Sequence, residues 1–183
     1  TGPFNNAGAV RIDGGSSLTV PFNYSQTNGS TTMNGGSLST NDTVDLLRGT
    51  FHGSSSASLD VSNAAEVSPG DPIGTLDVAR DYVETSTAAL RIDIGGRAVG
   101  TQYDQLRVTG SASLAGVLSI HLANGFVPTN GDLFTVLTCG MRSGTFARIE
   151  SPDFPAELWE IEYGTSYVRL RAANDTDNDG IKN

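Results

Sequence analysis

A short motif occurs twice near the start of the chain, as Gly14-Gly15-Ser16-Ser17-Leu18 and as Gly35-Gly36-Ser37-Leu38. Its two leucines are 20 positions apart, and apolar segments recur at a similar spacing at Leu59-Asp60-Val61 and Leu76-Asp77-Val78. Repetition of a strand-and-turn unit at about this period is typical of a β-solenoid, in which each repeat forms one coil. We therefore predict an all-β fold of stacked coils.

Segments that alternate apolar and polar residues recur along the whole chain. The alternation is clearest in Leu90-Arg91-Ile92-Asp93-Ile94 and in Leu118-Ser119-Ile120-His121-Leu122. A period of two predicts strands that bury one face and expose the other. The last third is richer in aromatic residues and is interrupted by Pro152 and Pro155. Because the open end of a solenoid must be covered, we expect this third to form a C-terminal cap.

Composition excludes several classes of function. The net charge of −9 at pH 7 disfavours nucleic acid and anionic membrane surfaces, which both attract basic residues. Lys182 is the only lysine, so the body of the chain has no lysine for a Schiff base or a P-loop. Cys139 is the only cysteine, and we expect it to be a small buried residue. No apolar run reaches the length of about 18 residues that a membrane-spanning helix needs.

The expected organisation is one β-helix module at 1–173, followed by an aspartate-rich linker or partial calcium loop at 174–183. The chain has neither an initiator methionine nor a signal peptide, which suggests a module of a longer protein with flanking modules as partners.

A succession of motifs resembles the β-helical repeats of large secreted bacterial proteins, including autotransporter-passenger-type domains. The resemblance covers about residues 4 to 171, and its motifs occur in this order: Gln26-Thr27-Asn28-Gly29, Val67-Ser68-Pro69-Gly70-Asp71-Pro72-Ile73-Gly74-Thr75-Leu76, Tyr103-Asp104-Gln105-Leu106-Arg107-Val108-Thr109-Gly110, Gly125-Phe126-Val127-Pro128-Thr129-Asn130-Gly131-Asp132-Leu133-Phe134 and Gly144-Thr145-Phe146. It implies a right-handed parallel β-helix (β-solenoid), an extracellular location at a bacterial surface, and a segment that is not an enzyme.

The tail Asp175-Thr176-Asp177-Asn178-Asp179-Gly180 resembles the first half of an EF-hand-type or thrombospondin-type-3-like calcium loop. Oxygen ligands on alternate residues can converge on one cation, which makes Asp175, Asp177 and Asp179 the candidate metal ligands and calcium the candidate cofactor. The acidic residue at loop position 12 would fall beyond the end of this sequence. A solvated acidic linker is the alternative.

Catalytic signatures are weak. The only histidines, His52 and His121, lack partners at metal-ligand spacing, and we expect both to lie on the surface. Asp77, Asp93 and Asp104 are candidates for the paired carboxylates of a polysaccharide lyase or hydrolase, but outward aspartate beside outward arginine is also the ordinary make-up of a solvated sheet. We expect no catalytic residues.

A polysaccharide could be recognised on one exposed sheet face, where aromatic rings stack on sugars and polar side chains bond to hydroxyl groups. Tyr82 lies between charged residues, which predicts exposure, whereas Trp159 shares the parity of apolar neighbours and fits the cap as well. The candidate carbohydrate-binding residues are Tyr82, Tyr103, Trp159, Tyr167, Arg91 and Arg107.

Two functions therefore stand side by side. The first is a non-catalytic extracellular carbohydrate-binding module, and the second is a structural stalk or adhesion segment of a large surface protein. A binding module needs exposed aromatic residues in a row on one sheet, whereas a stalk needs only polar faces and coils that continue into their neighbours.

Overall fold

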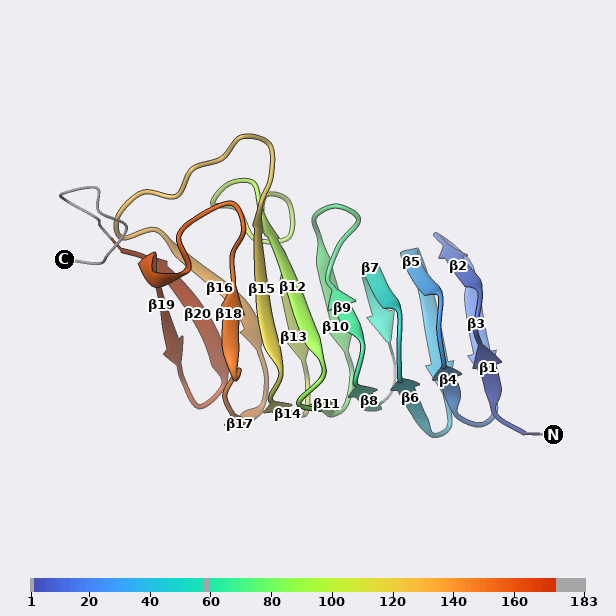
Figure 1. Ribbon diagram of the computed structural model, residues 1–183. Coiled ribbons are helices and arrows are strands. Elements are labelled where there is room, and N and C mark those ends of the chain that lie inside the picture. Colours follow the sequence, from blue (N-terminus) through green and yellow to red (C-terminus); the bar gives the residue numbers. More distant parts are fainter. Residues whose placement is uncertain (1, 58–59, 174–183) are drawn as a thin grey trace.

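The computed structural model describes residues 2–57 and 60–173, which form an all-β protein (Figure 1). Within these ranges there is no α-helix, and the one helical element is the single-turn 3₁₀ helix η1 (Ala156–Leu158). No helix in them is long and apolar enough to cross a membrane. The aspartates proposed as calcium ligands, Asp175, Asp177 and Asp179, lie outside the described residues.

A seven-stranded sheet runs the length of the molecule along one side, and all of its neighbouring strands are parallel. In spatial order it contains β1 (Phe4–Asn6), β4 (Tyr24–Gln26), β6 (Thr43–Leu46), β8 (Asp60–Asn63), β11 (Tyr82–Glu84), β14 (Ser111–Leu114) and β17 (Met141–Gly144).

A 13-stranded sheet forms the rest of the molecule and divides into two branches. It starts with β2 (Ala9–Asp13) and β3 (Ser17–Val20), which both pair with the long strand β5 (Ser30–Thr40), and continues to β7 (Thr50–Ala57). The first branch contains β9 (Glu66–Ser68), β12 (Ala89–Ile94), β15 (Val117–Leu122) and β18 (Arg148–Glu150). The second contains β10 (Thr75–Val78), β13 (Gln105–Val108), β16 (Leu133–Thr138), β20 (Tyr167–Ala172) and β19 (Trp159–Tyr163).

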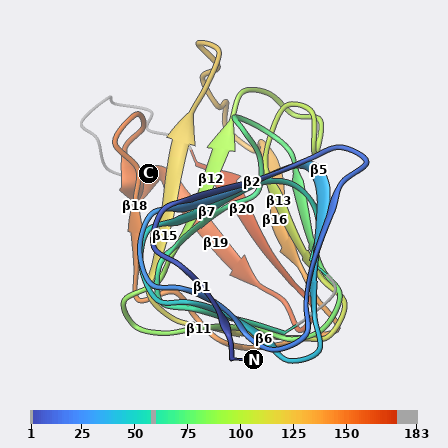
Figure 2. The ribbon, with the colours of Figure 1, turned by 90° about the vertical axis from the view of Figure 1, so that its right-hand side faces the viewer.

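The chain returns to the seven-stranded sheet at unequal intervals, which are short from Val44 to Val61 and long from Tyr82 to Ala112. The residues paired in one row are Tyr24, Val44, Val61, Tyr82 and Ala112. The view along the stack shows the chain winding around a common interior (Figure 2). Longer intervals arise because loops 69–74, 95–104 and 123–132 separate the two branches, and these loops gather along the upper edge in Figure 1.

The early repeat predicted the wrong register after its second copy. Leu18 does pair with Leu38, but Leu38 pairs next with Ala57, while Val61 belongs to β8 in the other sheet. The shift follows from the short interval between Val44 and Val61, which an average period cannot predict.

The C-terminal end departs from parallel pairing. β16 pairs antiparallel with β20, and β20 pairs antiparallel with β19, so the 13-stranded sheet is mixed. The short connection at 164–166 explains the last pair, because a connection of a few residues joins only antiparallel neighbours. The all-β class predicted from the sequence is confirmed, and the antiparallel strands lie in the third of the chain for which a C-terminal cap was expected.

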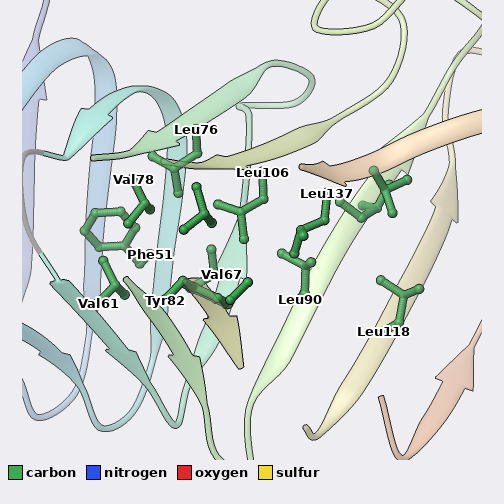
Figure 3. Close-up of a cluster of buried hydrophobic side chains, with 14 of the residues drawn as sticks. Phe51, Val61, Val67, Leu76, Val78, Tyr82, Leu90, Leu106, Leu118 and Leu137 are labelled. Carbon is green, nitrogen blue, oxygen red and sulfur yellow. The ribbon is translucent and has the colours of Figure 1, made fainter. Parts of the chain in front are cut away.

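Apolar side chains of the same row stack inside the molecule (Figure 3). In the first branch Val67, Leu90 and Leu118 are cross-strand partners, and all three are buried. In the second branch Leu76, Leu106 and Leu137 form the equivalent row. Burying a side chain of this size contributes on the order of 1.5–3 kcal/mol, so these rows stabilise the two branches that they cross. The predicted burial of Cys139 is confirmed.

Candidate functional site on the outer face of the first branch

Three of the four aromatic residues proposed to bind sugar are inside the protein. Tyr82 is fully buried, because it occupies the inward row of the seven-stranded sheet while Val83 points outward. Its hydroxyl accepts a hydrogen bond from Asn63 (3.0 Å) and donates one to Glu84 (2.9 Å). The predicted exposure of Tyr82 is therefore wrong: of the two charged neighbours that suggested it, Asp81 is exposed but Glu84 is itself buried.

The other two buried aromatics surround Phe134 near the C-terminal end. Tyr103 and Trp159 each meet the Phe134 ring edge to face, with centroids 5.4 and 6.0 Å apart. The Trp159 indole donates a hydrogen bond to Ser151 Oγ (3.1 Å). Burial of Trp159, one of its two predicted roles, is confirmed, and neither ring offers a face to a polysaccharide.

Tyr167 and Arg107 share one outward row of the second branch. The row runs from Asp77 through Arg107 and Thr138 to Tyr167. Arg107 makes a two-pronged ion pair with Asp77 (2.6 and 2.8 Å). Tyr167 is partly exposed, and the guanidinium of Arg169 lies 4.8 Å from its ring centroid. This row therefore remains a candidate sugar-binding face, with Tyr167 as its single aromatic ring.

Arg91 lies on the first branch and therefore away from that row. Its guanidinium pairs with Asp93 at 3.0 Å. Asp93 is buried, and its backbone N–H donates to Asp104. The second carboxylate oxygen of Asp104 accepts from the Gly74 N–H, and burial raises the pKa of Asp104 to about 8. Asp104 thus fastens loop 69–74 to β12 and is fully buried, out of reach of a glycosidic bond.

The same branch carries a set of polar contacts that the sequence did not predict. Ser119 and His121 both point outward from β15, and Ser119 Oγ lies 3.0 Å from His121 Nε2. The other ring nitrogen, Nδ1, lies 3.7 Å from a carboxylate oxygen of Asp153. That carboxylate is held in place by the backbone N–H of Leu122 (3.1 Å). A hydroxyl, an imidazole and a carboxylate are thus connected in order.

The surroundings of this set are open and charged. A hollow of about 330 Å³ is lined by Ser119, His121, Glu150, Ser151 and Pro152. In the parallel ladder Arg91 is the cross-strand partner of Ser119 on one side, and Glu150 is its partner on the other. Neighbouring strands lie about 4.8 Å apart, so these side chains flank the hydroxyl directly.

Sequence reasoning treated His121 as a surface histidine with no partner at metal-ligand spacing. The usable signal was the spacing of Ser119 and His121, since alternate residues of a strand share a face. Asp153 lies in the loop after β18, and only the ladder between β15 and β18 brings it close. Among the described residues, no group of three or more histidine, cysteine, aspartate or glutamate side chains could hold a metal ion.

Searches of protein-family models and of curated proteins found no match to this chain.

Proposed function

We propose that the chain is a right-handed parallel β-helix that serves as a structural stalk or adhesion segment of a large extracellular bacterial surface protein. Two observations together carry the proposal. The outer faces of the described residues show no row of exposed aromatic rings, and their side chains form continuous rows that are polar on the outside and apolar on the inside. A stalk needs these two properties and no ligand pocket.

The two ends of the stack differ in a way that supports this role. In the described chain β1, β2 and β3 each pair on one side only, and Phe4 and Phe22 are 39% and 42% exposed there. At the other end, Trp159 and Phe154 lie with ring centroids 5.1 Å apart over the last coil. Unpaired strand edges and exposed core side chains favour the stacking of one more coil, so we propose that flanking repeats continue from β1 to β3.

Adding a coil tests this proposal. A copy of residues 24–43 joined directly to Phe4 would place Tyr24 of the copy over Phe4, in the register seen between Tyr24 and Val44. We expect a melting temperature several degrees higher than that of the parent chain, because one more apolar layer is buried. An extension of the same composition in scrambled order is the control. Equal melting temperatures for the two extended chains would contradict the proposal.

Polysaccharide binding is the second candidate function, and the outward row that contains Arg107 and Tyr167 favours it. Affinity electrophoresis against xylan, β-glucan, mannan, pectin and alginate tests it, with Arg107→Ala and Tyr167→Ala as variants and Arg171→Ala as control. Retardation that only the two row variants lose would support this function over the stalk. Retardation that a chelator abolishes would support the proposed calcium site at Asp175, Asp177 and Asp179.

A further inference from the structure

We propose that Ser119, His121 and Asp153 form a hydrolytic triad that cleaves neutral carboxylic esters presented at the surface of the first branch. A nucleophilic serine needs a base within hydrogen-bond reach and a third group that orients the base. Here the base lies 3.0 Å from the hydroxyl, and the carboxylate lies 3.7 Å from the far side of the ring. The proposal goes beyond a stalk and departs from the expectation of a segment without catalytic residues.

The strand geometry fixes the relative positions of the two reacting groups. Ser119 and His121 are two residues apart on β15, so the pleat directs both side chains to the same side. Their strand is paired on both sides, with β12 and with β18. A site on a paired strand is held more firmly than one on a free loop.

Asp153 lies on the Nδ1 side of the His121 ring and favours the tautomer that the chemistry requires. With its proton on Nδ1 facing Asp153, the neutral imidazole presents a bare Nε2 to the Ser119 hydroxyl. The Leu122 N–H donates to the same carboxylate oxygen at 3.1 Å and keeps it beside the ring. Asp153 is therefore a positioning residue, and Ser119 and His121 are the catalytic residues.

The reaction balances with water as the only co-reactant. Ser119 Oγ adds to the ester carbonyl carbon while its proton moves to His121 Nε2. Collapse of the tetrahedral intermediate breaks the bond to the alkoxy group, which takes the proton from Nε2 and leaves as an alcohol. Water then attacks the acyl-serine with the same proton transfers, releases the carboxylic acid and restores the hydroxyl.

We assign to Arg91 the stabilisation of the negative charge that develops on the carbonyl oxygen, although its side chain lines a separate hollow with His52 and Asp93. It stands opposite Ser119 in the ladder, and its pair with Asp93 uses two of its five N–H donors. Fixed donors aimed at a developing oxyanion are usually the largest contribution to this kind of catalysis.

The charges around the hollow define the substrate class. Arg91 and Arg148 are paired with Asp93 (3.0 Å) and Glu150 (2.7 Å), and the exposed carboxylate of Asp153 adds negative charge, so phosphate esters and other anions are disfavoured. The hollow is shallow and open, which suits an ester that projects from a larger molecule or a short free ester. An ester carbonyl is more reactive than an amide carbonyl, because nitrogen donates to the carbonyl more strongly by resonance and leaves only when it is protonated, so esters are favoured over amides.

Two measurements on the whole chain test the triad. The first is hydrolysis of p-nitrophenyl acetate by the parent chain and by Ser119→Ala, His121→Asn and His52→Asn. The last is the matched control, because His52 is the only other histidine and also contacts a hydroxyl, that of Thr32 (2.6 Å). Any loss of rate in His52→Asn therefore measures the hydrolysis that a surface imidazole outside the triad causes.

The second measurement is covalent labelling with a fluorophosphonate, followed by peptide mass spectrometry. Its phosphorus bonds to the serine oxygen as fluoride leaves, and it requires no variant to fold. We expect label on Ser119 in the parent chain and in His52→Asn but not in His121→Asn. We also expect Ser119→Ala and His121→Asn to lower hydrolysis at least about 100-fold, the scale of general base catalysis.

Two results would overturn the triad. One is equal hydrolysis by the parent chain, Ser119→Ala and His121→Asn, which would mean background imidazole or solvent chemistry. The other is the absence of label on Ser119 in the folded parent chain. The role of Asp153 is tested by Asp153→Asn, which should lower kcat with little change in KM; an effect on KM alone would contradict a positioning role.

Discussion

Replacing Glu84 with glutamine should remove a pH dependence of stability that a single buried carboxyl group causes. Glu84 lies in the interior, where one oxygen accepts a hydrogen bond from Tyr82 (2.9 Å) and the other accepts one from the Ala115 N–H (3.4 Å). Burial raises its pKa from 4.5 to about 8, against the two hydrogen bonds, which lower it. Desolvation disfavours the charged form, which is why the shift is upward.

The sign follows from proton binding. Between pH 4.5 and 8 the folded chain holds a proton on Glu84 and the unfolded chain does not, so the free energy of unfolding falls as pH rises. One proton corresponds to about 1.4 kcal/mol per pH unit, or on the order of 4 kcal/mol from pH 5 to pH 8. The stabilisation is complete below pH 4.5 and is lost as pH rises to about 8.

Guanidinium chloride unfolding at pH 5, 6, 7 and 8, followed by far-UV circular dichroism, measures this slope. We expect Glu84→Gln to gain stability relative to the parent chain by about 1.4 kcal/mol for each pH unit, because other titrating groups cancel in the difference. The amide also presents an NH2 group to either the Tyr82 hydroxyl or the Ala115 N–H, but any cost of that change does not depend on pH.

Tyr82→Phe is the control for this experiment. It keeps the buried carboxyl group and removes a hydrogen bond that lowers its pKa, so it should reduce stability at every pH and preserve the slope. A constant difference between Glu84→Gln and the parent chain from pH 5 to pH 8 would refute the reasoning. It would mean that Glu84 has the same protonation state in the folded and unfolded chains.

Three further substitutions test the fold, and one tests a surface pair. Asp104→Asn should remove the corresponding pH dependence of the unfolding free energy, because burial raises the pKa of Asp104 to about 8. It should also cost about 1–3 kcal/mol at pH 5, because one of the two backbone N–H groups that donate to Asp104 is left unpaired. The same unfolding series measures both effects. Gly53→Ala should prevent folding or lower the melting temperature sharply in a thermal scan, because its φ is +120° and an added Cβ would lie 1.9 Å from a carbonyl oxygen of the neighbouring coil. Leu90→Ala should cost about 2–5 kcal/mol in chemical unfolding, as expected for a fully buried leucine. Arg107→Ala should change the unfolding free energy by less than about 1 kcal/mol in the same assay, because its ion pair with Asp77 is half exposed.

Local structure was largely predictable, because alternation and turn residues act within a few positions. The segment Leu90-Arg91-Ile92-Asp93-Ile94 forms β12 with its leucine and isoleucines buried, as the alternation predicts. The turn-rich stretch at 69–74 separates two strands, as its prolines and glycines predict. Both results depend on chemistry that one segment carries by itself.

The register between paired strands was less predictable, because the repeat period of the sequence is an average over intervals of different length. The interval between paired residues of the seven-stranded sheet is short from Val44 to Val61 and long from Tyr82 to Ala112. The alternation of apolar and polar residues is the same in both arrangements: two short strands separated by a loop, as at 69–74, and one long strand, such as β5, that takes the place of both. The same limitation misplaced Tyr82, whose inward position depends on its pairing with Val61.

The polar contacts of the first branch show why a site on stacked strands is hard to predict. Within a strand, Ser119 and His121 are neighbours by simple spacing, but Arg91 and Asp153 are close only through the coils before and after. Each coil adds a sequence interval that changes with its loops, so residues of one site have no fixed spacing for a motif to record. Once a register is known, the outward rows can be read across strands as directly as along them. A catalytic set in such a fold should therefore be sought across adjacent outward rows, and the row from Arg91 through Ser119 to Glu150 holds the serine of the triad that we propose here.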